Sequence, residues 1–345
     1  MIRFPCARFN ARGPGAVLAG LLLAAGAGAT TVPAEEVVEL DEVVVTGVQP
    51  GPGLWRVSRG AGEGEVWILA TLIPLPQDMQ WNAGQVEQLL ETADEVIAPA
   101  HVEMDIGAGD VFKMASLARA ANAAIKLPDR ERLQDRLPAE HYAHWSRLKA
   151  RLLPDDDKLE RQRPVFASQT LFYAAISDAG LTRSNVAWAR VSELAADREL
   201  RVVDPTIRSP LAIDRKAYRS GIRALAESKV DDVGCFISTM ETLETDLAHF
   251  TRAANAWATG DLERLLPMEL AAPVPACKPV YDRAMSFQQR PELRVQALDA
   301  WRAAVEAAVA ERRTALAVLP LADLVGAKGV LAQLTASGHK VEAPE

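Results

Sequence analysis

Residues 54–71 read LWRVSRGAGEGEVWILAT, and this segment predicts two β-strands joined by a tight turn. The apolar runs 54–58 and 65–71 are typical of strands, and the glycine-rich residues 60–64 between them favour a hairpin. Strand patterns return near the other end of the chain, in residues 315–319 and 340–342. Because strands from both ends flank a helical middle, we expect an α/β fold whose mixed sheet is formed by the N- and C-terminal segments.

The middle of the chain carries the spacing of helices. From Asp110 to Arg313 apolar residues recur every three or four positions, and strand patterns are short, in residues 95–98 just before this region and 201–204 within it. A long helical segment ends at Gly260-Asp261, a stop followed by a new helix start. No linker rich in Pro, Gly or Ser divides this region. We therefore expect one domain, residues 54–345, with a large helical middle.

The first 29 residues have the three parts of a secretory signal peptide. Arginines at positions 3, 8 and 12 form a positive start, residues 16–25 are rich in Leu and Ala, and the small residues 27–29 suit signal peptidase. An uncleaved membrane anchor is the alternative, but the apolar run is shorter than the roughly 20 residues that a span needs. We therefore expect residues 1–29 to be removed, leaving a periplasmic protein that does not span the membrane. Residues 30–53 are expected to form a flexible tail.

The charge of the chain excludes some partners. The full chain has a formal net charge of −8, and removing a signal peptide with three arginines and no acids gives −11. Nucleic acids and anionic lipids attract proteins through clustered Lys and Arg. We therefore expect an acidic body of this kind to repel both nucleic acid and anionic lipid.

Two cysteines remain once the signal peptide, which contains Cys6, is removed. Cys235 and Cys277 are expected to form a disulfide in an oxidising compartment, closing a loop of about 40 residues. The alternatives are two buried thiols or a redox pair. A redox pair is disfavoured because nothing in the sequence resembles Cys-x-x-Cys.

Several further segments follow the two opening strands in a fixed order. They are Leu89-Leu-Glu-Thr-Ala-Asp-Glu-Val-Ile97, Ala256-Trp-Ala-Thr-Gly-Asp-Leu262, and residues 324–334 followed by Gly338-His-Lys-Val-Glu342. In content, order and spacing this series resembles the TraB/GumN family, which includes the TIKI-type metalloproteases and the pheromone-shutdown protein PrgY. The resemblance covers nearly all of the chain from Leu54. It implies a mixed-sheet core shared with erythromycin-esterase-like and ChaN-like proteins.

The resemblance also implies a metal site, whose ligands this chain lacks. Active members hold a divalent ion with the His of a Gly-x-x-His motif after the first long strand, a Glu on the next strand, and the His of a second Gly-x-x-His near the C-terminus. The corresponding residues here are Ile73, Ala98 and Asp323. Isoleucine and alanine have no lone pair to give a metal, and one carboxylate alone cannot hold a catalytic ion. The resemblance therefore points to a pseudoenzyme without a cofactor.

Ligands at other positions would restore a metal site. His101, Glu103 and Asp105 alternate and would share one face of an extended segment, although a polar loop explains them as well. His141 and His144 lie one helical turn apart, but no third ligand accompanies them.

The remaining motif content offers no catalytic group. His339 follows Gly338 in an expected turn and should be exposed to solvent. The sequence has no nucleophile elbow, P-loop or dinucleotide-binding motif. We therefore assign no catalytic or cofactor-binding residue.

These observations favour an exported, non-catalytic family member that binds a peptide or glycan in the cell envelope. One alternative is a metal-dependent hydrolase or peptidase with displaced ligands. Another is an interaction protein that acts through its tail, because Glu39-Leu-Asp-Glu-Val-Val-Val-Thr-Gly47 resembles the TonB-box segment of TonB-dependent receptors. Its β-branched run could add a strand to an envelope partner, although an unstructured leader or an edge strand of the protein's own sheet is the simpler interpretation.

Overall fold

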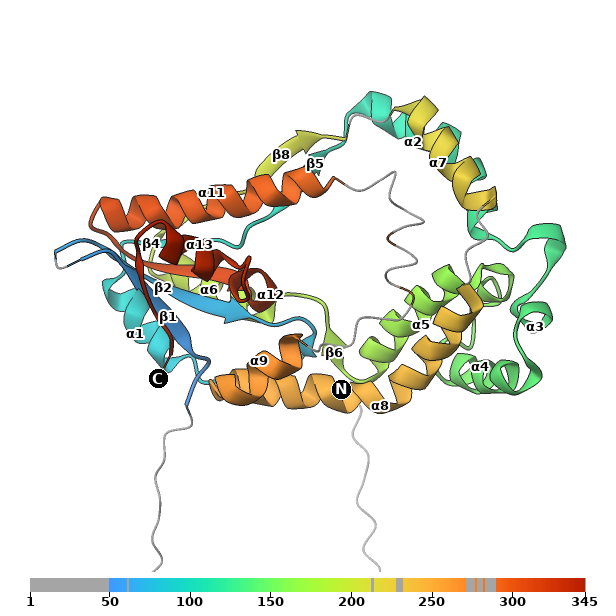
Figure 1. The fold of residues 1–345 in the computed structure, drawn as a ribbon, viewed down its shortest axis with the longest axis horizontal. Coiled ribbons are helices and arrows are strands. Elements are labelled where there is room, and N and C mark those ends of the chain that lie inside the picture. The colour runs from blue at the N-terminus through green and yellow to red at the C-terminus, as the bar shows by residue number, and fades with distance from the viewer. Residues whose placement is uncertain are drawn as a thin grey trace, which may run out of the picture. The chain divides into compact units, whose positions relative to one another are not determined.

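A computed structural model describes residues 50–60, 62–211, 214–227, 232–270, 277, 282 and 290–344 (Figure 1). These residues belong to one compact unit, residues 48–345. The predicted signal peptide, the tail up to residue 49 and the TonB-box-like segment lie outside the described residues. Their assignments therefore stay predictions.

The centre of the fold is a six-stranded mixed sheet. Its strands follow one another across the sheet in the order β10 (Lys340–Glu342), β1 (Leu54–Ser58), β2 (Glu65–Thr71), β9 (Thr314–Pro320), β4 (Glu95–Ile97) and β7 (Arg201–Val203). β1 pairs antiparallel with β10 and β2, whereas β2, β9, β4 and β7 run parallel. The predicted hairpin is therefore present, and the prediction that strands from both ends of the chain share one mixed sheet is confirmed.

Helices pack on this sheet and complete its core. They are α1 (Gly84–Thr92), α6 (Val186–Asp197), α11 (Pro291–Ala310), α12 (Leu321–Leu324) and α13 (Val330–Ala336). Most residues of the central strands are buried, with Ile68 of β2 and Val318 of β9 at 0% exposure. Trp301 of α11 is also buried, and its indole N–H donates to the carbonyl oxygen of Val318 at 3.0 Å. Because a buried tryptophan needs an acceptor for its N–H, this bond fixes α11 against β9.

A second hydrophobic core lies among the helices of the middle region. These are α3 (Leu133–Arg136), α4 (Ala139–Leu152), α5 (Pro164–Asp178) and the first part of α8 (Asp232–Ala258). The last turns of α8 and the helix α9 (Leu262–Leu270) belong instead to the core of the sheet. Trp145 of α4 is fully buried, and the centre of its ring lies 5.3 Å from that of Phe236 in an edge-on arrangement. Its indole N–H donates to the carboxylate of Glu160 at 2.8 Å. α8 ends where the sequence predicted, since Gly260 has a positive φ of 67°.

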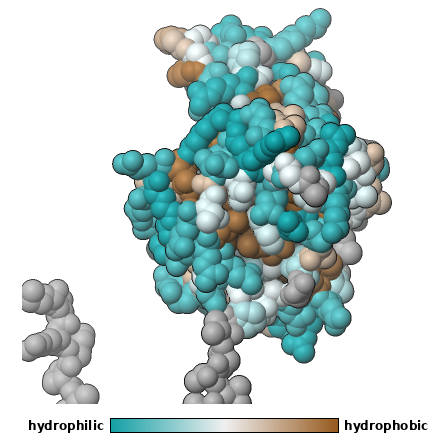
Figure 2. Space-filling model, turned by 90° about the vertical axis from the view of Figure 1, so that its left-hand side faces the viewer, coloured by the Kyte–Doolittle hydropathy of each residue, from teal (hydrophilic) through white to brown (hydrophobic). Residues whose placement is uncertain are grey.

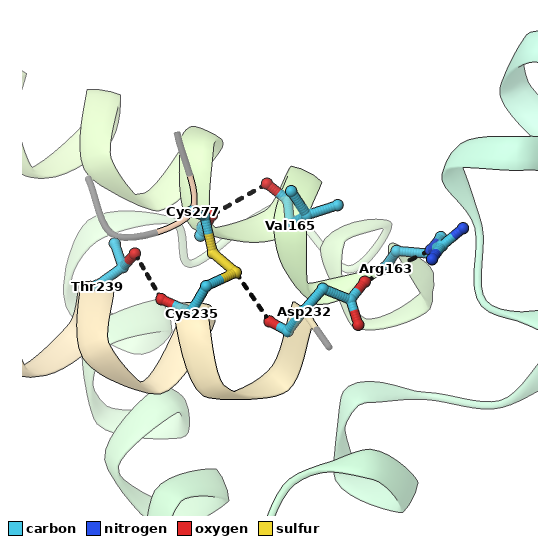
Figure 3. Close-up of a disulfide and its surroundings, with 7 residues drawn as sticks. Arg163, Val165, Asp232, Cys235, Thr239 and Cys277 are labelled. Atoms are coloured by element: carbon cyan, nitrogen blue, oxygen red, sulfur yellow. Dashed lines mark hydrogen bonds and ion pairs between the residues drawn. A yellow bond between two sulfur atoms is a disulfide. The ribbon is translucent and has the colours of Figure 1, made fainter. Parts of the chain in front are cut away.

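The two cysteines belong to this second core (Figure 3). The sulfur atoms of Cys235, in the first turn of α8, and Cys277 lie at disulfide-bonding distance, and their Cα atoms are 4.7 Å apart. Nearby, the buried pair Arg163 and Asp232 approach to 3.4 Å. The structure thus brings together the two cysteines that the sequence pairs, and the bond in exported protein stays a prediction.

The chain contains more strands than the sequence indicates. β3 (Leu75–Pro76) pairs with β6 (Leu181–Thr182), and β5 (Val102–Asp105) pairs with β8 (Ile207–Pro210). β5 and β8 expose alternate residues and each has one neighbour, so neither carries a long apolar run. They lead into α2 (Ala108–Ile125) and α7 (Arg215–Glu227), which contact each other.

The exterior is consistent with a chain in which charged residues make up 24% of the sequence. Figure 2 shows one face, which is mostly hydrophilic with separate hydrophobic patches. Within the part of the chain that the structure describes, no helix is long and apolar enough to cross a membrane.

Candidate functional site

Three adjacent parallel strands end at the same edge of the sheet. They are β2, β9 and β4, and the positions that correspond to the implied metal ligands directly follow their carboxyl ends: Ile73 after β2, Asp323 after β9 and Ala98 after β4. In open α/β sheets ligands bind at such carboxyl ends. This edge is therefore the first candidate site, and the three positions follow neighbouring strands of the sheet.

An arginine occupies this edge of the sheet. Arg294 of α11 forms an ion pair with the carboxylate of Asp323, and it donates a hydrogen bond to the carbonyl oxygen of Ala100 at 3.1 Å. Burial raises the pKa of Asp323, and the charge of Arg294 acts in the opposite direction. One guanidinium thus links the helix after β9 to the segment after β4.

The donor groups at this edge do not fit a divalent metal ion. The side chains of Ile73 and Ala98 carry no donor atom, and the carboxylate of Asp323 already pairs with a cation. Across the described ranges, no group of three or more His, Cys, Asp or Glu residues is arranged to hold a metal. We therefore derive no metal chemistry from this edge.

A pocket of about 650 Å³ lies elsewhere on the sheet, beside β1, β2 and β10. Its walls include Arg56 and Trp67 from the strands, Gln85 and Gln88 from α1, and Gly260 from the turn between α8 and α9. The volume is within the range of small-molecule sites in proteins. Polar and aromatic side chains share its wall, so the pocket can combine hydrogen bonding with stacking.

Charged groups border the pocket in pairs. Arg56 pairs with Glu65 at 2.6 Å and with Glu342 at 3.3 Å, and its guanidinium lies 5.7 Å from the centre of the Trp67 ring. The hydrogen bond to Glu65 is the main cause of a raised pKa of Arg56, and the hydrogen bond from Lys340 is the main cause of a lowered pKa of Glu342. Arg56 and Glu342 are therefore both charged at neutral pH, and the two ion pairs hold Arg56 beside Trp67.

The indole N–H of Trp67 has an unmet hydrogen-bonding requirement. Its nitrogen is buried, and it has no acceptor among the described residues. A buried donor without an acceptor costs about 1–3 kcal/mol and calls for an explanation.

A comparison with models of protein families shows to which family this chain belongs. The model of the TraB/PrgY/gumN family matches residues 53–343. The chain belongs to the TraB/PrgY/gumN family. Neither the curated proteins nor the solved structures gave a match. The family region contains all six strands of the mixed sheet, the edge at Asp323 and nearly the whole pocket wall.

In this TraB/PrgY/gumN protein the segment Trp257-Ala-Thr-Gly-Asp-Leu262 joins α8 to the sheet. Trp257 is buried, and its N–H donates to the carbonyl oxygen of Ala70 in β2 at 2.7 Å. A Cβ atom on Gly260 would lie 2.9 Å from the carbonyl oxygen of Gly51, so the turn requires glycine for space as well as for its positive φ. The segment therefore positions one wall of the pocket.

The residues that could replace the missing metal ligands do not come together in one site. Glu103 and Asp105 are exposed on one face of β5, as alternation predicts, but Glu103 pairs with Arg208 of β8 at 3.3 Å. His141 and His144 both lie on α4, and the ring of His141 lies 3.6 Å from Glu140. No arrangement of three ligands arises from them among the described residues.

One histidine prediction is wrong. His339 was expected to be exposed but is only 6% exposed. Its Nδ1 lies 3.1 Å from the hydroxyl of Ser337, which donates to Glu306 of α11. The following strand β10 joins the sheet and α13 precedes it, so the turn at Gly338 directs His339 inward.

The sequence analysis did not identify Arg294 at the strand ends or Trp67 in the pocket. Arg294 lies in an ordinary helical pattern, and nothing local marks it as a partner of Asp323. Trp67 could have been found, because Glu65 and Trp67 alternate with buried residues and so share the less buried face of β2.

Proposed function

We propose that this protein is an exported, non-catalytic member of its family that binds a glycan in the cell envelope. The pocket beside β1 and β2 carries the proposal, since Trp67, two glutamine amides and paired carboxylates surround one cavity. The predicted signal peptide supports an envelope location. We also propose that the sheet corresponds to the erythromycin-esterase-like and ChaN-like core that the family resemblance implies.

The chemistry of the wall favours a sugar over a peptide. Sugar hydroxyls both donate and accept, and they match the amides of Gln85 and Gln88, which present donors and acceptors side by side. The flat ring of Trp67 in the pocket wall offers an apolar surface on which a sugar ring can stack. A volume of about 650 Å³ suits one or two sugar rings.

The donor groups at the strand ends support the proposed loss of metal-dependent hydrolysis. Ile73 and Ala98 cannot coordinate an ion, and Arg294 neutralises Asp323. A hydrolase with displaced ligands would require His, Asp or Glu residues to converge elsewhere. Zinc in stoichiometric amount in the purified protein, measured by atomic emission, would support that alternative.

The test compares binding of peptide-free peptidoglycan saccharides with binding of sugar-free stem peptides by calorimetry. We expect the saccharides to bind and the Gln85→Ala/Gln88→Ala variant to lose about ten-fold or more in affinity, since each lost hydrogen bond contributes about 1 kcal/mol. Both glutamines are exposed, so the variant should fold. Gln134→Ala, an exposed glutamine on α3, is the matched control. Binding of the stem peptides alone, or equal affinity in all variants, would contradict the proposal.

A further inference from the structure

Two helices leave the small sheet of β5 and β8 side by side. The two strands are parallel, and the N–H of Leu211 donates to the carbonyl oxygen of Asp105 at 3.0 Å, just past the ends of both. α2 starts at Ala108 and α7 at Arg215, and the two helices contact each other. Their first turns therefore lie close together. We refer to residues 106–125 and 214–227 as the arm.

The α2 side of the arm exposes large apolar side chains. Phe112 is 75% exposed, Ile106 57%, Val111 52% and Met114 37%. Only three of the 18 residues of α2 are charged, and its exposed alanines extend the apolar surface along the helix. A helix that is apolar on its solvent side is normally covered by something.

The α7 side of the arm is basic. Arg215, Lys216, Arg219 and Arg223 are all exposed, and none of them has an ion pair with the described residues. Asp214, the acid next to them, accepts hydrogen bonds from the backbone N–H groups of Lys216 and Ala217, which lower its pKa. α2 and α7 together carry six Lys or Arg and two Asp or Glu, in a chain whose formal net charge is −8.

We propose that the arm docks on an anionic membrane surface. Apolar side chains such as Phe112 would enter the boundary of the acyl chains, while the basic side chains of α7 contact lipid phosphates. This combination of exposed apolar and unpaired basic groups matches lipid in charge as well as in polarity. A second copy of the chain fits less well, because apposed arms would bring two sets of basic residues together. The proposal is independent of the glycan pocket.

The experiment uses protein purified from the periplasm, with its mature N-terminus verified by mass spectrometry so that no uncleaved signal peptide contributes. Flotation measures its partition onto vesicles of equal parts phosphatidylglycerol and phosphatidylcholine, and onto vesicles of phosphatidylcholine alone. We expect binding only to the anionic vesicles and a decrease with added salt, since salt screens the attraction.

Two variants and two matched controls locate the surface. Lys216→Gln/Arg219→Gln should lower the partition coefficient about 25-fold, at about five-fold for each basic residue near the surface. Phe112→Ser should lower it about ten-fold. The controls change comparably exposed residues outside the arm, Arg59→Gln/Arg147→Gln and Val295→Ser, and should bind as the parent does.

Three outcomes would overturn the proposal. They are no binding to the anionic vesicles, binding that both arm variants retain, and a solution dimer that Phe112→Ser dissociates in protein that does not bind vesicles. The last, measured by sedimentation velocity, would identify a second copy as the partner of the arm.

Discussion

Replacing Arg294 by Met tests the structure at the carboxyl ends of the parallel strands. The guanidinium pairs with Asp323 and donates to the carbonyl oxygen of Ala100, so the change removes both contacts while keeping an apolar stem of similar length. It leaves the carboxylate of Asp323, whose side chain is 22% exposed, without its cation.

The expected loss lies between two limits. Exposed ion pairs contribute up to about 1 kcal/mol, and breaking a buried pair costs about 3–5 kcal/mol. The Arg294 side chain is 42% exposed, so solvent screens part of the interaction. We expect Arg294→Met to lower the free energy of unfolding by about 2 kcal/mol at pH 7, which for a unit of this size lowers Tm by about 3 °C.

The loss should depend on pH in a definite direction. Burial raises the pKa of Asp323, and without Arg294 this effect is unopposed, so the pKa rises further. A carboxyl whose folded pKa is raised supports the folded state most below its unfolded pKa, and this support is lost as the pH rises through the folded pKa. The penalty of Arg294→Met should therefore be smaller at pH 4 than at pH 7.

Urea unfolding at both pH values, followed by circular dichroism, measures these effects. Asp323→Asn and the double variant complete a cycle, in which we expect a coupling of about 1 kcal/mol. The control is Arg151→Met, because Arg151 lies 3.8 Å from Asp178 in a pair whose side chains are both more than half exposed. The ion pair does not form if three results are found together. Arg294→Met then lowers the free energy of unfolding no more than the control does, the loss is the same at both pH values, and the losses from Arg294→Met and Asp323→Asn add in the double variant.

Two further changes test the second core. Replacing Cys235 and Cys277 by Ser should lower the free energy of unfolding by about 4 kcal/mol, because a cross-link between residues 42 positions apart restricts the unfolded chain. Mass spectrometry of the non-reduced, exported wild type should find no free thiol. Two free thiols in exported protein would contradict the pairing. Asp232→Asn tests a second carboxyl whose pKa is raised, chiefly by burial, with Arg163 acting against it. Because a raised pKa in the folded state favours the protonated form, wild type should lose stability relative to Asp232→Asn as the pH rises from about 4 to 7. Thermal melts over this range measure the difference, and Tm values that change in parallel would show that Asp232 has an ordinary pKa.

The parts of the fold predicted from the sequence are those with strong local patterns. β2 and β9 are long apolar runs. Gly260 follows the end of α8 with a positive φ, the conformation in which glycine commonly ends a helix. β5 and β8 were missed because short strands with alternate exposed residues resemble polar loops. His339 was misjudged because burial in a turn depends on what packs over it, here Ser337 beside α11.

The candidate sites were less predictable because they depend on pairs that are distant in sequence. Ile73, Ala98 and Asp323 were assigned to the right edge because each follows a recognisable strand. The cation beside them was not foreseen, since 29 residues separate Arg294 from Asp323 and no spacing rule links them. The pocket likewise joins residues from both ends of the chain, from Pro50 to Pro344.

The structure also explains how the scaffold can persist without a metal at the strand ends. Two tryptophan N–H bonds hold helices to the central strands, from Trp257 to Ala70 in β2 and from Trp301 to Val318 in β9. Neither bond involves the edge where metal ligands would lie. At that edge the positive charge of Arg294 compensates the one remaining carboxylate, which would otherwise be partly buried and unpaired. Because helices hold the sheet from its faces and Arg294 pairs with the carboxylate at its edge, we expect this chain to fold without a bound ion.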